Sequence, residues 1–291
     1  MPQLWGRVTL TCRMESRRPP IPDPVKRAVR QRCGFGCVIC GLPIYDYDHL
    51  VPWNIVREHR PDNLVLLCAQ HHREKTSGLL PTTVVMAASA DPCNLQTGVS
   101  HPYDLRYAGD HCEALIGSNR HIWSSLADDS FTVPLIVDDT PLVLFRAQQG
   151  HPLLTVQLFD QRNQLLVQIV DNELVFSTAS WDIELAGRHL TVRGGPGDIF
   201  VSMTFEVPAR VVIDRARLWR NGIEVDVSPE RLFLVRDRNI ISRLVASNCA
   251  VGIAIGNAPP LPGAVRIGSS RGSFDTIPAT ESRVCRVVLP Q

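Results

Sequence analysis

The stretch CGFGCVICGLPIYDYDHLVPWNIVREHRPDNLVLLCAQHHREKTSGLL, residues 33–80, contains two short pairs of metal-ligand residues. They are Cys37-x-x-Cys40 and Cys68-x-x-His71. A two-residue gap lets one tight turn direct both side chains at a single ion, and two such turns supply the four tetrahedral N and S ligands that zinc prefers. The spacing therefore predicts a structural zinc site.

Two other interpretations of these cysteines compete with zinc binding. A single C-x-x-C pair is also typical of a redox couple, and cysteines often serve as small buried hydrophobic residues. The second pair, Cys68 and His71, argues against both, because neither redox chemistry nor burial requires four ligands at this spacing.

Further polar residues lie between and beside these ligands in a fixed order. The combined pattern is C-x-x-C, Asp-His, Asn-Leu and L-C-x-x-His-His-x-x-K, and it resembles the HNH nuclease family, which has the ββα-metal fold, over roughly residues 24–80. The residues that carry it are Cys37 and Cys40, Asp48-His49, Asn63-Leu64, and Leu67 to Lys75. There are two departures: His71 stands where many members have a fourth cysteine, and residues 53–60 replace a frequent Gly-Gly turn.

The resemblance implies a metal-dependent endonuclease that hydrolyses phosphodiester bonds in DNA. His49 is then the general base, since the unperturbed pKa of histidine lies near neutrality. Asn63 would orient its imidazole. Asp48 and His72 would hold a divalent ion such as Mg²⁺ or Mn²⁺, and His72 also counts, with His49 and Asn63, among the catalytic residues.

Residues 23–33, DPVKRAVRQRC, are predicted to form a short helix, because Asp23 can cap it and Pro24 suits its first position. Basic side chains on this helix and on the one after Cys68 are expected to contact phosphate, with a solvated helix face as the alternative. The expected nucleic-acid contacts are Lys26, Arg27, Arg30, Arg32, Arg73 and Lys75.

The charge distribution favours a nucleic-acid partner for the first part of the chain. Residues 1–80 hold 12 Lys and Arg against 7 Asp and Glu, whereas the remainder holds 18 against 22. The basic excess thus accompanies the nuclease-like pattern. A formal net charge of +1 for the whole chain excludes a strongly basic DNA-coating protein.

From Tyr103 onward, short runs of β-branched and aliphatic residues alternate with turn signals such as Asn221-Gly222, and helical periodicity is essentially absent. This pattern predicts an all-β domain, either a sandwich or an irregular solenoid. The predicted strands are Pro141–Arg146, Leu153–Asp160, Gln164–Asp171, Glu173–Ser177, Trp181–Leu185, Leu190–Arg193, Ile199–Val207, Val211–Leu218, Ile223–Val227 and Ala250–Ile255.

The expected fold class is therefore α+β, a small zinc-stabilised ββα-metal domain followed by a larger all-β domain. We expect a flexible arm over residues 1–22, the nuclease domain over 23–80, a junction over 81–102 with a helix at Thr82–Ala90, and the β domain over 103–291. The β domain has no second catalytic constellation, so we expect it to serve assembly, targeting or regulation, as a homo-oligomer or with a partner protein.

The composition and the first residues of the chain indicate the expected cellular compartment. No run of about eighteen apolar residues exists, so no membrane span is expected. The N-terminus lacks a signal-peptide pattern, and nine cysteines, an odd number, argue against a secreted disulfide framework. We expect a cytoplasmic protein, and the resemblance implies a role in prokaryotic restriction or antiviral defence. The alternative is a catalytically silent module that binds nucleic acid or protein.

Overall fold

The computed structural model describes residues 18–124, 126–259, 262–263 and 265–267, together with the backbone of 274–276 and 286–288. Of the arm expected over residues 1–22, residues 1–17 lie outside the described part. The helices in the described part are α1 Asp23–Arg32, α2 Trp53–Val56, α3 Ala69–Thr76, α4 Thr82–Ala90 and α5 Cys93–Thr97, with a 3-10 turn at Pro61–Asn63.

The first part of the chain is built on a two-stranded antiparallel sheet. Strand β1 (Asp46–His49) pairs with β2 (Leu64–Leu67), and His49 lies opposite Leu64. All four residues of β2 are fully buried. They form a small core with residues of α1 and α4, including Val29 and Val85. This core holds β1 and α3 in place, and these two elements carry most of the predicted site residues.

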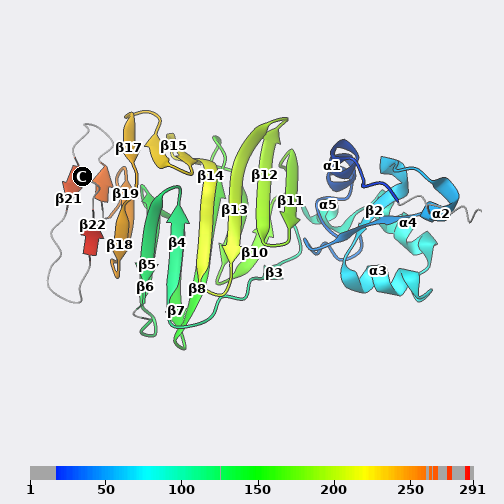
Figure 1. The fold of residues 1–291 in the computed structure, drawn as a ribbon, viewed down its shortest axis with the longest axis horizontal. Coiled ribbons are helices and arrows are strands. Elements are labelled where there is room, and N and C mark those ends of the chain that lie inside the picture. Colours follow the sequence, from blue (N-terminus) through cyan, green and yellow to red (C-terminus); the bar gives the residue numbers. More distant parts are fainter. Residues whose placement is uncertain are drawn as a thin grey trace, which may run out of the picture.

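The second part of the chain is β-rich and consists of two large sheets (Figure 1). In the described part, the nine-stranded sheet has the order β21 (Phe274–Thr276), β20 (Val265–Ile267), β19 (Val251–Ile255), β6 (Phe131–Val137), β7 (Thr140–Gln148), β8 (His151–Phe159), β9 (Leu165–Val170), β10 (Glu173–Phe176) and β3 (Tyr103–Asp104).

The other sheet has eleven strands in the described part. Its main path is β11 (Asp182–Ala186), β12 (His189–Gly195), β13 (Asp198–Glu206), β14 (Arg210–Arg220), β4 (Cys112–Ile116), β5 (Asn119–Trp123), β18 (Val245–Ser247) and β22 (Arg286–Val288). A branch from β14 adds β15 (Ile223–Ser228), β16 (Arg231–Leu234) and β17 (Asn239–Ile241).

The two sheets pack face to face. Their shared hydrophobic core contains residues of both, such as Phe145 of β7 and Val201 of β13, and strands β8 and β14 contact each other across it. Most neighbours are antiparallel, but β14 with β4 and β6 with β19 are parallel pairs. Of the two predicted architectures, the structure shows the layered arrangement of a sandwich and not a solenoid.

The two parts of the molecule meet where α1 lies beside β11 (Figure 1). Arg30 of α1 is 4% exposed and donates two hydrogen bonds to the fully buried Asp182 carboxylate, at 2.8 and 2.7 Å. It also donates to Glu184 at 2.9 Å. Because such a pair leaves no unsatisfied charge between the two surfaces, it fixes the orientation of α1 on the β-rich part.

The predicted elements are largely confirmed. The helices expected over 23–33 and at Thr82–Ala90 form, and each predicted β segment coincides with a strand. Within the described residues, no helix has the length and apolarity that crossing a bilayer requires. Cys33, Cys93 and Cys112 are free thiols, whereas Cys249 is disulfide-bonded. The proposed domain boundaries stay predictions.

Candidate metal centre and nuclease site

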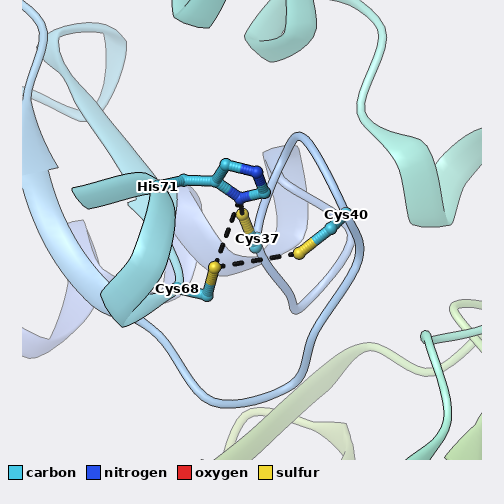
Figure 2. Close-up of side chains that lie close together, drawn as sticks. All are labelled: Cys37, Cys40, Cys68 and His71. Carbon is cyan, nitrogen blue, oxygen red and sulfur yellow. Dashed lines mark hydrogen bonds between the residues drawn. The ribbon is translucent and has the colours of Figure 1, made fainter. Parts of the chain in front are cut away.

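Four predicted zinc ligands converge in the first part of the chain (Figure 2). The donor atoms of Cys37, Cys40, Cys68 and His71 all lie within 4.8 Å of one another. The His71 Nδ1 atom is 3.4 Å from the Cys37 sulfur and 3.2 Å from the Cys68 sulfur, and the Cys40 and Cys68 sulfurs are 3.8 Å apart. A tetrahedral zinc ion with Zn–S bonds of ~2.3 Å separates its sulfur ligands by ~3.8 Å, so the donor set fits zinc.

The loop that presents Cys37 and Cys40 is held by its own backbone and by Asn94. Gly41 N–H donates to the Cys37 carbonyl at 2.7 Å, which closes the turn. The Asn94 amide donates to the Gly34 and Gly41 carbonyls at 2.9 and 3.0 Å, and Asn94 is 1% exposed. A hydrogen bond from the Cys40 thiol lowers the pKa of Cys37 and favours a thiolate, the form that binds metal.

The two adjacent histidines of α3, His71 and His72, point in different directions. Consecutive helical residues do not face the same side, so His71 points at the cysteines while His72 faces β1. The His72 Nε2 atom is 3.5 Å from Asp48 Oδ1, and its Nδ1 atom is 3.6 Å from Asp46 Oδ2. The structure thus brings together the two residues that were predicted to hold a divalent ion.

Lys75 lies on the other side of the Asp48 carboxylate. Its ammonium group is 2.5 Å from Asp48 Oδ2 and donates to the His49 carbonyl at 2.6 Å. The side chain is only 12% exposed. Lys75 was expected to contact nucleic acid; in the structure its charge instead contacts Asp48 and the end of β1, and the expected contact stays a prediction.

The His49 imidazole lies on the opposite side of β1, as adjacent strand residues do. It is 5% exposed and is covered by Trp53 and His59, with ring centroids 5.6 and 5.3 Å away, while Trp53 and His59 stack at 4.5 Å. Arg18 places a guanidinium nitrogen 2.7 Å from His49 Nδ1. No hydrogen bond among the described residues joins this imidazole to Asp48 or His72; Lys75 connects Asp48 only to the His49 backbone carbonyl.

The surroundings of His49 favour the neutral imidazole. Burial lowers its pKa below the ordinary value, and the positive charge of Arg18 and the neighbouring His59 lower it further. A neutral imidazole is the form that a general base requires at neutral pH.

Asn63 was predicted to orient the His49 imidazole, and in the structure its side chain bonds to Val51 instead. Its side-chain oxygen accepts the Val51 N–H at 2.8 Å, and its amide donates to the Val51 carbonyl at 3.1 Å. The Asn63 carbonyl also accepts the Leu50 N–H at 2.8 Å. Asn63 therefore fixes the backbone that follows His49, which positions the strand end instead of the ring.

The basic residues on α1 are used largely for structure. Arg30 is buried against the β-rich part and pairs with Asp182, a position that does not favour the expected nucleic-acid contact. Arg32 donates to the Ser89 hydroxyl at 2.5 Å and to the Leu64 and Pro61 carbonyls. Arg27 lies over the Trp181 ring at 4.7 Å.

Two of the expected phosphate contacts keep their charge toward solvent. Arg73 is exposed on α3. Lys26 is one-third exposed and forms an ion pair with Asp23 at 3.6 Å. These two side chains remain candidates for phosphate contact.

Sequence reasoning missed four residues that shape these sites, namely Arg18, Trp53, His59 and Asn94. Arg18, Trp53 and His59 lie in the arm and the loop where the sequence departs from the family pattern, so no pattern assigned them a role. Asn94 lies outside the pattern altogether. The sequence offered one indication, namely that residues 53–60 replace the glycine turn of the family. A loop without glycine can place bulky side chains over the end of the strand.

The small antiparallel sheet, the following helix and the Cys₃His cluster resemble the arrangement expected of an HNH nuclease domain. Comparison with family models supports this resemblance: the model described as HNH endonuclease matches residues 31–78. This part of the chain is an HNH domain, and the predicted resemblance is confirmed. Comparison with curated proteins and with solved structures gives no match.

Proposed function

We propose that this protein is a metal-dependent endonuclease that hydrolyses phosphodiester bonds in DNA. The observation that carries the proposal is the pair of Asp48 Oδ1 and His72 Nε2, 3.5 Å apart, at the end of the strand that also carries His49. An oxygen and a nitrogen at this separation can both reach one cation through bonds of ~2.1 Å, which suits Mg²⁺ or Mn²⁺.

Each side chain has a distinct task in this proposal. His49 accepts the proton of the attacking water, and its lowered pKa keeps it ready to do so. Asp48 and His72 would hold the divalent ion, which when bound stabilises negative charge on the phosphate and the leaving oxygen. Lys75 holds the Asp48 carboxylate in one orientation.

Access to His49 requires movement of its cover. Arg18 and the Trp53–His59 stack leave 5% of His49 exposed, so a DNA strand reaches the imidazole only when they shift. The same burial favours a second candidate function, a catalytically silent module that binds nucleic acid or protein through the zinc-stabilised fold.

A plasmid-cleavage assay separates the two candidates. Supercoiled DNA is incubated with the full chain and Mg²⁺ or Mn²⁺, and the wild type is compared with His49→Ala and His72→Ala. The proposal predicts nicked or linear product from the wild type alone, with unchanged melting temperatures in both variants, because neither residue belongs to the zinc cluster. A wild type that binds but never cuts DNA would establish the silent module.

The wider setting is also part of the proposal. A cytoplasmic enzyme of prokaryotic restriction or antiviral defence agrees with the HNH domain and the basic excess of residues 1–80. The β-rich part would supply assembly with a second copy or a partner protein, because a double-strand break requires two cutting events.

A further inference from the structure

A cavity of about 310 Å³ lies in the β-rich part, close to the HNH domain. Its walls come from both sheets, since Leu166 belongs to β9 while Val192, Phe200 and Trp219 belong to β12, β13 and β14. The volume lies at the lower end of the ~300–1,000 Å³ range of small-molecule sites. It can hold one ligand of nucleotide size but not a duplex.

The cavity offers flat aromatic surfaces. Trp219 is parallel to Phe200, with an interplanar angle of 3° and a centroid separation of 5.8 Å. Trp181 lines another wall. Both tryptophans are partly exposed, and each has a guanidinium over its ring, Arg217 over Trp219 and Arg27 over Trp181. A planar ligand ring would stack on the part of each tryptophan that remains exposed.

The cavity also offers more hydrogen-bond donors than acceptors. Arg193 and Arg217 line it, and each guanidinium carries five N–H donors. Arg193 donates one hydrogen bond to Asp182 at 3.2 Å. Arg217 forms an ion pair with Asp198, and its guanidinium lies over the Trp219 ring at 5.7 Å. The remaining donors call for a ligand that is rich in acceptor oxygens.

Two further groups in the wall point the same way. The Ser180 hydroxyl is buried and has no hydrogen-bond partner among the described residues. The Oδ1 atom of the Asp160 carboxylate accepts the N–H groups of Arg162 and Gln164 at 2.8 Å each. The Ser180 hydroxyl is therefore available as a donor to a ligand.

We propose that this cavity binds a nucleotide, with the base stacked on Trp181 or Trp219 and the phosphate held by Arg193 and Arg217. A planar ring satisfies the aromatic walls, and a phosphate supplies the acceptors that the guanidinium forks match. The ligand is either a free nucleotide or the terminal nucleotide of a nucleic-acid strand, which share this chemistry.

Binding of a nucleotide would affect the HNH domain, because two residues at the cavity, Trp181 and Arg193, are connected to helix α1. Arg27 of α1 lies over Trp181 at 4.7 Å, and Gln31 donates to the Trp181 carbonyl at 2.7 Å. Arg193 and Arg30 share Asp182 Oδ2, at 3.2 and 2.7 Å.

Arg30 in turn donates to the hydroxyl of Tyr47 at 2.9 Å, and Tyr47 is on the same strand as His49. Occupancy of the cavity is therefore coupled to the strand end. This consequence rests on the proposed nuclease function, whereas binding itself does not.

Calorimetry on the full chain without added divalent ion tests the binding. The probes are the four nucleoside monophosphates and a 5′-phosphorylated single-stranded octamer. Adenosine, which lacks the phosphate, inorganic phosphate, which lacks the base, and maltose, a sugar with neither, are the comparison ligands. We expect at least one monophosphate to bind in the micromolar range, and adenosine and phosphate to bind at least tenfold more weakly. Octamer binding that a monophosphate displaces would identify a strand end as the source and would equally support the proposal.

Two variants and a matched control locate the site. Trp219→Leu and Arg217→Gln should each weaken binding at least tenfold, while Arg231→Gln should not, because Arg231 lies over Phe233 at 5.1 Å on β16, outside the cavity. If Trp219→Leu fails to fold, Arg217→Gln decides. Absence of nucleotide binding at millimolar concentration, binding of maltose alone, or wild-type affinity in both variants would overturn the proposal, whatever the cleavage assay shows.

Discussion

Lys75 shows how a single side chain can acquire a role that its sequence position does not reveal. The pattern H-x-x-K placed it on the same helix as His72 and predicted a phosphate contact. In the structure its ammonium lies between the Asp48 carboxylate and the His49 carbonyl. Arg73, its close neighbour on α3, is exposed and remains a candidate for phosphate contact.

Replacing Lys75 by Met should lower cleavage roughly 10–100-fold, the usual effect of removing a partner of a metal ligand. Asp48 would lose the charge that orients it, while the methionine fills much of the same space. Arg188→Ala is the control, because it removes an exposed positive charge from the β-rich part of the chain without touching Asp48. Steady-state rates over a Mn²⁺ titration measure the effect. An equal loss in both variants would mean that Lys75 acts only through overall charge.

The residues that sequence spacing could predict are those whose partners lie nearby in the chain. The Cys and His ligands and the Asp48–His72 pair followed from spacing within a few dozen residues. Arg30 could not be predicted in this way, because its partner Asp182 is 152 residues away. The orientation of Asn63 depends on a loop that departs from the family pattern, so spacing alone did not predict its bonds to Val51.

At the scale of elements, the zinc-binding loop is the part on which the HNH domain depends. Its core is small, and in such domains the metal contributes folding free energy directly. Cys68 also directly precedes α3 and makes no side-chain capping hydrogen bond, so the helix that carries His72 depends on Cys68 through the metal cluster.

Cys68→Ser should therefore abolish zinc binding and unfold the segment 33–76. Elemental analysis should find one zinc per chain in the wild type and none in the variant, together with a loss of helical circular dichroism. Cys93→Ser is the matched control, since Cys93 is a free thiol outside the cluster. A folded Cys68→Ser protein without zinc would refute a structural role for the ion.

The contact between α1 and β11 makes a second prediction. Arg30→Met leaves Asp182 buried with its main partner gone, and breaking one half of such a pair costs about 3–5 kcal/mol. The double variant Arg30→Met/Asp182→Leu should recover part of that loss, because no charge is then left uncompensated. Urea unfolding of the single and double variants measures both terms. Additive losses would contradict the proposed pairing.

The strands that the sequence missed have physical explanations. Strand β6 contains Pro134, which lacks an N–H and normally excludes a central strand. The structure tolerates it where the register with β7 shifts between Thr132 and Leu135. Strands such as Tyr103–Asp104 and Val245–Ser247 are too short to give a periodic signal.

At the scale of the whole molecule, burial in the β sandwich creates a pH dependence of stability. His121 of β5 is 5% exposed and its Nε2 atom is 2.6 Å from the Thr132 hydroxyl. Burial lowers the pKa of His121 to about 4. The unfolded chain, with an ordinary pKa near 6.5, therefore binds a proton that the folded chain refuses as the pH falls from 6.5 toward 4.

Stability should accordingly be full above pH 6.5 and decline by up to about 3 kcal/mol by pH 4, from ~1.4 kcal/mol per pH unit. His121→Gln keeps a donor toward Thr132 but does not titrate, so its unfolding free energy should fall less over the same range. Denaturant unfolding at pH 4, 5, 6 and 7 measures the difference. Parallel curves for the two proteins would exclude His121 as the cause.

The layered architecture illustrates what lay beyond sequence reasoning. Alternation of residues predicted β structure, but whether successive strands stack into coils or divide into two sheets depends on pairings far apart in the chain, such as β14 with β4 and β6 with β19. No local turn signal encodes such parallel pairs. The position of the HNH domain beside β11 is a long-range property of the same kind.

The central claim is that Asp48 and His72 hold a divalent ion at the end of the strand that carries His49, apart from the zinc cluster. Anomalous diffraction from crystals soaked in Mn²⁺ tests it most directly. The account predicts a manganese peak between Asp48 Oδ1 and His72 Nε2, and a separate zinc peak among Cys37, Cys40, Cys68 and His71. A fully occupied manganese peak elsewhere, with the Asp48–His72 position empty, would contradict it.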